Sequence, residues 1–138
     1  MTEFIFLLFL TAASFSDIRY QRIDNALNLA GALAGAVILI HTRDIEIISD
    51  ALLASWLVFI VLVLLFMLRL IGAGDIKFLM AASLFTGRAI LFSSLPYMLS
   101  AVIIITLPKV IKQKSFLNIY FPAAVPISAG LLCGLYIR

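Results

Sequence analysis

Charged residues are scarce in this chain of 138 residues: Asp, Glu, Lys and Arg make up 12% of it, whereas hydrophobic residues make up 64%. A typical globular domain has about 25% charged and about 45–50% apolar residues. This composition excludes an ordinary soluble domain, and the long apolar runs exclude a disordered chain. We expect no nucleic-acid partner either, since the net charge of +3 is distributed between long charge-free stretches. The composition indicates a protein of the lipid bilayer.

Metal ligands are equally scarce. The chain has one cysteine, Cys133, and one histidine, His41. A zinc site needs three or four converging ligands, and a disulfide within the chain needs a second cysteine. We therefore expect no metal, no cofactor and no intrachain disulfide.

Apolar segments fill most of the chain, and each is expected to be helical because lipid offers no partner to exposed backbone polar groups. They cover residues 4–15, 26–40, 51–70, 75–86, 89–107 and 119–137. A bilayer-spanning helix takes about 20 residues, so about six spans fit with no room for a soluble domain. We expect an all-α membrane protein, a compact polytopic bundle of about six transmembrane helices forming a single domain over residues 1–138.

Two of these segments allow another interpretation. The first run, residues 4–15, has the length of a signal-peptide core, but the basic region that precedes such a core is missing. The fourth, residues 75–86, is about 18 Å long at 1.5 Å per residue, and a re-entrant segment is the alternative there.

The distribution of basic residues predicts the orientation. With six spans and the N-terminus outside, seven of the ten basic residues fall on the cytoplasmic side and three outside, as the positive-inside rule requires. The cytoplasmic set is Arg19, Arg22, Arg69, Lys77, Lys109, Lys112 and Lys114. A re-entrant fourth segment would weaken the split to six against four.

Small residues recur four apart in two segments, as Gly31 with Gly35 and as Gly130 with Gly134. This spacing lets helices approach closely. We expect packing within one bundle, although a homo-oligomer is compatible with the same pattern.

The acidic residues are the best guide to chemistry, because a carboxylate in or beside a membrane span costs about 2.5–3.5 kcal/mol at mid-depth. We assign Glu3, Asp44, Glu46 and Asp50 to outer loops or the N-terminus, where they are solvated. That leaves Asp17, Asp24 and Asp75, which the topology places on the cytoplasmic side.

Asp75 follows Gly72-Ala73-Gly74 at the start of an apolar run. The two glycines permit a close approach of another chain and unusual φ values, and a helix cap is the alternative role of Asp75. Asp17 ends the first span, and two carboxylates on different helices can act together on one water. Asp24 is an alternative partner, although its position directly before a span favours a role as N-cap.

The motifs around these acids resemble the type IV prepilin peptidases, a family of intramembrane aspartic proteases. The resemblance rests on Asp17-Ile-Arg-Tyr-Gln-Arg-Ile-Asp-Asn25, on Gly72-Ala-Gly-Asp-Ile-Lys77 and on the closing stretch 121–130. Gly-x-Gly-Asp also occurs in the presenilin group, but there the two acids lie on consecutive helices, whereas here two spans separate them.

The resemblance implies that Asp17 and Asp75 are the catalytic pair and that Gly72 and Gly74 shape the approach to Asp75. Lys77, Asp24 and Asn25 belong to the same motifs and are expected to line or shape the active site. The implied substrates are prepilins or pseudopilins, whose short basic leader ends in Gly ahead of a hydrophobic helix. The implied place is the bacterial cytoplasmic (inner) membrane, beside the machinery that assembles pili or type II secretion systems.

The chain departs from the family pattern in two respects. Asp24 stands where the family has Pro, and the N-terminal region with paired cysteines of longer members is absent. We therefore expect the short form found in tight-adherence pilus systems, without N-methyltransferase activity. Two other classes stay open: a small transporter or channel subunit with a broken-helix ion site at residues 72–75, and a non-catalytic scaffold of a secretion system.

Overall fold

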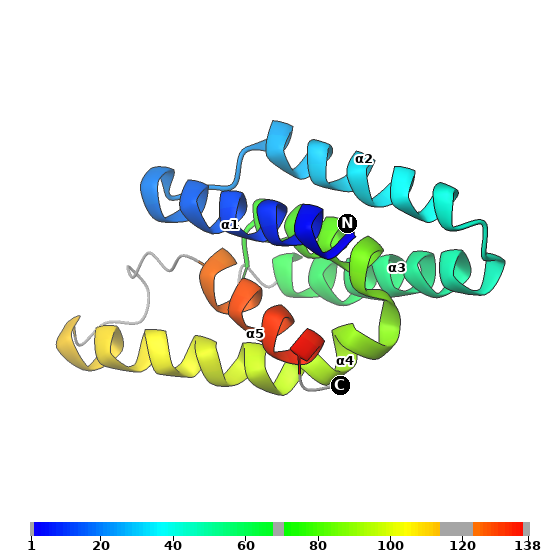
Figure 1. Cartoon of the computed structure of the whole chain (residues 1–138). Coiled ribbons are helices and arrows are strands. Elements are labelled where there is room, and N and C mark those ends of the chain that lie inside the picture. The colour runs from blue at the N-terminus through cyan, green and yellow to red at the C-terminus, as the bar shows by residue number, and fades with distance from the viewer. Residues whose placement is uncertain (1, 68–70, 114–122, 137–138) are drawn as a thin grey trace.

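A computed structural model describes residues 2–67, 71–113 and 123–136, and within them all regular structure is helical. The all-α prediction is confirmed. Figure 1 shows the helices packed as one bundle. The elements are α1 (Thr2–Tyr20), α2 (Asn25–Thr42), α3 (Ile45–Met67), α4 (Ala73–Gln113) and α5 (Ala124–Tyr136).

The fourth and fifth predicted segments both belong to α4, whose 41 residues are interrupted at Gly87. Figure 1 shows that the chain reverses direction there, so the two arms of α4 run antiparallel. We call residues 73–86 the first arm and residues 88–113 the second arm. The predicted boundaries at residues 68–70 and 119–122 lie outside the described residues.

Gly87 makes this reversal possible. Its φ of 66° and ψ of −175° lie in a region that is accessible essentially to glycine alone. Asp50 of α3 then completes the turn, because its Oδ2 accepts the backbone N–H of Arg88 at 2.8 Å and its Oδ1 accepts from Nε of the same residue. A carboxylate from another helix thus caps the second arm.

This arrangement corrects the assignment of acids to outer loops. Helix α3 begins at Ile45, six residues before its predicted start, so Glu46 and Asp50 lie within it. Asp44 is the cap of α3, accepting the backbone N–H of Glu46 at 2.9 Å. The prediction started this helix at Ala51 because Glu46, Ser49 and Asp50 interrupt the isoleucines of residues 45–50, most of which are exposed.

The first arm of α4 lies in the centre of the bundle. Phe78 and Ala82 are fully buried, and the Phe78 ring lies 5.4 Å from that of Phe9 on α1. Burial against other helices explains why this segment carries small and polar residues such as Ser83, which a lipid-facing helix would avoid.

Among the described residues, three helical stretches are long and apolar enough to cross a membrane: Asn25–Thr42, Ile45–Met67 and Ala73–Ile104, the last of which includes the reversal at Gly87. Helix α3 exposes large apolar side chains such as Trp56, Ile60 and Leu64. An uncovered surface of this kind is stable in lipid. The structure therefore has the form of a multi-pass membrane protein.

The recurring glycines pack inside the bundle, as predicted. A Cβ at Gly31 would lie 2.3 Å from the Phe9 ring, and one at Gly130 would lie 2.6 Å from the backbone nitrogen of Met98. Helix α2 therefore approaches α1 closely at Gly31. Helix α5 approaches the second arm of α4 closely at Gly130, and both contacts lie within a single chain.

Gly130→Ala is expected to lower the stability of the bundle by roughly 1–3 kcal/mol, because the new methyl group meets backbone that cannot rotate away. Gly74→Ala is the matched control, since a Cβ there meets nothing closer than 3.8 Å. Thermal unfolding of both variants in detergent micelles measures the difference. Equal midpoints for the two variants would show that the α4–α5 contact is not tight.

Candidate active site

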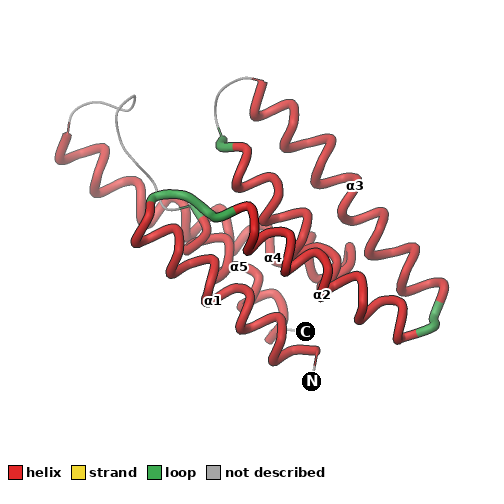
Figure 2. Tube along the Cα trace, turned by 90° about the horizontal axis from the view of Figure 1, so that it is seen from above, coloured by secondary structure: helices red, strands yellow, loops and turns green. Residues whose placement is uncertain are grey.

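The connections 21–24 and 71–72 lie at one end of the bundle, and the connection 43–44 lies at the other (Figure 2). At the first of these ends the helices enclose a cavity of about 780 Å³. Its lining comes from the end of α1, the 21–24 connection, α3, both arms of α4 and the start of α5. The topology thus gathers residues far apart in the sequence around one hollow.

Asp17 lies in the last turn of α1 and is only 4% exposed. Its Oδ2 accepts the backbone N–H of Ala124, the first residue of α5, at 2.8 Å. A second contact between these helices joins the hydroxyl groups of Ser14 and Ser128 at 2.9 Å. The start of α5 therefore fixes the orientation of the Asp17 carboxylate.

Asp75 lies in the first turn of α4 and is partly buried. Its Oδ2 accepts the backbone N–H of Gly72 at 3.2 Å, which is the acidic half of a capping box. The carboxylate also lines the cavity. The two alternative roles of Asp75, helix cap and cavity group, are therefore compatible in one position.

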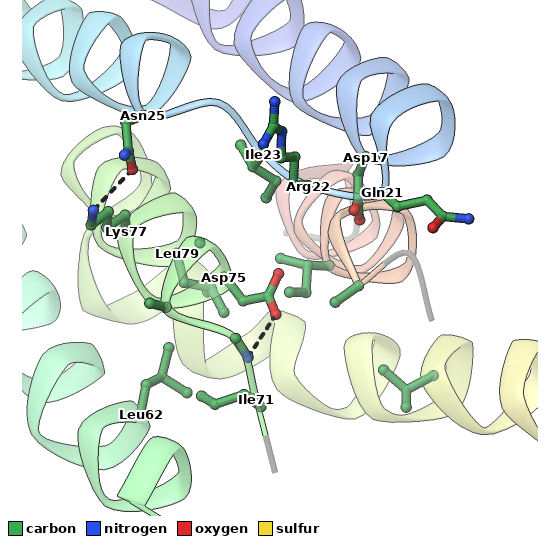
Figure 3. A pocket seen from close by; sticks show the side chains of 16 residues that line it. Asp17, Gln21, Arg22, Ile23, Asn25, Leu62, Ile71, Asp75, Lys77 and Leu79 are labelled. Atoms are coloured by element: carbon green, nitrogen blue, oxygen red, sulfur yellow. Dashed lines mark hydrogen bonds between the residues drawn. The ribbon is translucent and has the colours of Figure 1, made fainter. Parts of the chain in front are cut away.

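The fold brings these two acids together. Asp17 and Asp75 both line the cavity, and Figure 3 shows their carboxyl groups pointing into the same space from opposite sides. Two carboxylates that share one proton can act as a base and an acid on the same water. Among the described residues, no three His, Cys, Asp or Glu side chains are grouped as a metal would require.

Gly72 and Gly74 line the cavity beside Asp75, but neither has a positive φ. The expected use of unusual backbone angles is therefore wrong: Gly72 directly precedes α4 and Gly74 lies in its first turn, both without a positive φ. What they provide is space. A Cβ at Gly72 would lie 3.3 Å from Asp75 Oδ2, and one at Gly74 would lie 3.8 Å from the carbonyl oxygen of Ile23.

The remaining motif residues separate into two groups. Asp24 is exposed, is not among the residues that line the cavity, and caps α2 by accepting the backbone N–H of Ala26 at 3.2 Å. Its predicted role as N-cap is confirmed. Asn25 and Lys77 do line the cavity, and the Lys77 ammonium group donates to Asn25 Oδ1 at 2.9 Å (Figure 3).

Sequence reasoning missed three residues at this end of the bundle. Gln21 lines the cavity and has a φ of 56°, uncommon for a residue other than glycine. Ala124 lies in the stretch 121–130 that carries the resemblance, but its contact with Asp17 could not be predicted, because it is made by a backbone N–H. Asn28 donates from Nδ2 to the carbonyl oxygen of Gly74 at 3.3 Å, and its signal was its position as a polar residue within the apolar run 26–40.

Residues 4–111 match the model of the type IV leader peptidase family, peptidase A24. The match covers most of the 138 residues and includes Asp17 and Asp75. The chain belongs to the type IV leader peptidase family. Members of this family are aspartic peptidases, so the resemblance found in the motifs is confirmed. Comparison with curated proteins and with solved structures gives no match.

Proposed function

We propose that this leader peptidase removes the basic leader from prepilins or pseudopilins at the cytoplasmic face of the bacterial inner membrane, with Asp17 and Asp75 as its catalytic pair. The observation that carries the proposal is the convergence of these two carboxyl groups on one cavity, from helices 58 positions apart in sequence (75 − 17). Family membership supplies the substrate class.

The proposed reaction needs one ionised and one protonated carboxyl group around a water molecule. The ionised group takes a proton from the water as the water oxygen bonds to the peptide carbonyl carbon, and the other group protonates the carbonyl oxygen. In the resulting gem-diol a proton passes to the amide nitrogen and the C–N bond breaks. The products are the leader with a free carboxyl end and the pilin with a free amino end.

The contacts of each carboxyl group support this scheme. Ala124 N–H holds Asp17, and Gly72 N–H holds Asp75, so neither group is free to rotate out of the cavity. Fixed positions let both acids act on one water without first paying the cost of ordering. The absence of side chains at Gly72 and Gly74, which line the cavity beside Asp75, supports a close approach of a substrate backbone there.

The same proposal includes the orientation. The two arms of α4 supply the fourth and fifth of six membrane-embedded helical segments, with the N-terminus outside and the cavity facing the cytoplasm. Arg22 and Lys77 line the cavity, which agrees with the excess of basic residues expected on that side.

The direct test is incubation of the purified protein, reconstituted in liposomes, with a prepilin-like peptide that has a basic leader, Gly and an apolar helix. We expect one cut after the Gly, identified by the masses of the two products. Proton or ion flux across the same liposomes without any cleavage would contradict the proposal and favour the transporter interpretation.

A further inference from the structure

A second hollow lies beside the catalytic cavity. It is a groove of about 370 Å³ between α2, α3 and the first arm of α4. Its walls are mostly apolar, formed among others by Leu29, Ala32, Met80 and Leu84. The groove and the cavity share two lining residues, Asn25 and Lys77. The groove and the cavity are therefore neighbours, with the hydrogen-bonded Asn25 and Lys77 between them.

Asn28 is the unusual residue of this groove. The residue is buried, with only 4% of its surface exposed, and it lines the hollow. Its Nδ2 donates to Gly74, but its Oδ1 is buried without a hydrogen-bond partner among the described residues. An unsatisfied buried acceptor destabilises the free protein, and most buried polar side-chain atoms in folded proteins have a partner in the protein or in ordered water.

We propose that the groove receives the start of the substrate's apolar helix and that Asn28 Oδ1 accepts a backbone N–H from its first turn. This inference rests on the proposed function. The first four N–H groups of a helix have no partner within the helix, and apolar surroundings offer none. A hydrogen bond between Asn28 Oδ1 and one of these N–H groups would give both atoms the partner that each lacks when the enzyme and the substrate are apart.

The position of Asn28 determines which part of the substrate it meets. Its amide is bonded to the carbonyl of Gly74, the residue directly before Asp75. A donor bound at Oδ1 therefore belongs to the first few residues after the cut bond. The oxygen is shielded in the free protein, so the substrate reaches it by displacing side chains of the groove, the hydrogen-bonded Lys77 and Asn25 included. Recognition of a backbone group depends little on the pilin's side chains.

The test combines a change in the enzyme with a change in the substrate. Prepilin-like peptides are made with a single N-methyl group on the second, third or fourth residue after the cut, which removes one N–H donor at a time. Each peptide is cleaved in liposomes by the unmodified protein, by Asn28→Leu, and by the control Ser55→Ala, which alters another polar residue of the same groove.

We expect N-methylation at one of the three positions to lower kcat/KM about tenfold, mainly through KM, for the unmodified protein and for Ser55→Ala. In Asn28→Leu the same methyl group should cause no further loss, because the acceptor is already gone. If the loss caused by N-methylation is as large in Asn28→Leu as in the unmodified protein at every position, the inference is overturned. The role of Asn28 would then be limited to its hydrogen bond with Gly74.

A second measurement covers the case in which Asn28→Leu does not fold. With the unmodified protein alone, N-methylation must lower kcat/KM at one of the three positions only. An equal loss at all three positions, or no loss at any of them, would overturn the inference. The proposed function is judged separately by the unmethylated peptide. If that peptide is cut and the methylation pattern fails, only the Asn28 contact is wrong; if it is not cut, both are wrong.

Discussion

Asp17→Asn and Asp75→Asn are each expected to lower the rate of prepilin cleavage by about 10²–10⁴-fold, the contribution of general acid–base catalysis by one group. Asparagine can neither take a proton from water nor donate one to the carbonyl oxygen. Cleavage of a prepilin-like peptide, followed by mass spectrometry, measures the loss. Full processing by either variant would exclude these acids as the catalytic pair.

Both variants should remain folded in the membrane, and the reason lies in their hydrogen bonds. The amide oxygen of Asn can accept the N–H of Ala124 at position 17 and the N–H of Gly72 at position 75, as the carboxylate does now. Thermal unfolding midpoints close to that of the unmodified protein would confirm that the loss of activity is chemical.

Asp24→Asn is the matched control, because it removes one negative charge at the same end of the bundle. Asp24 is exposed and not among the residues that line the cavity, and Asn is as good an N-cap as Asp for α2. Cleavage should stay within about twofold of the unmodified rate. A loss equal to that of Asp17→Asn would mean that Asp24 belongs to the reacting pair.

The sequence was sufficient to predict the apolar helices and the meeting of Asp17 with Asp75. The apolar runs of the sequence correspond to helices, and the connections 21–24 and 71–72, beside which the two acids lie, are at one end of the bundle (Figure 2). The sequence could not decide between capping and catalysis for Asp75, because the same carboxylate accepts from Gly72 and faces the cavity. These two roles do not exclude one another.

Contacts between distant residues could not be predicted in this way. Asp50 and Arg88 are 38 positions apart, and each is flanked by residues that suit a solvated connection. Only the packing of α3 against α4 makes them partners. The contact between Asn28 and Gly74 could not be predicted either. A polar residue in an apolar helix indicates that it has a polar partner, but not which residue that partner is.

Gly87→Ala is expected to destabilise the bundle more than Gly130→Ala does, because two separate costs add at position 87. Backbone strain at a φ of 66° and a ψ of −175° costs a residue with a Cβ roughly 1–3 kcal/mol. The new Cβ would also lie 2.6 Å from Asp50 Oδ2, so it displaces the carboxylate that caps the second arm of α4. Loss of such a cap adds about 0.5–2 kcal/mol.

A double-mutant cycle separates these two causes. Asp50→Ala by itself removes the cap, and Gly87→Ala in that background should cost only the backbone strain, since the carboxylate that it would meet is gone. The fluorescence of the single Trp56 during unfolding in detergent provides the measurement. If the stability losses of Asp50→Ala and Gly87→Ala add fully in the double variant, Asp50 does not stabilise the chain reversal at Gly87. Residual folded enzyme should still cleave, because position 87 is twelve positions, about 18 Å of helix, from Asp75.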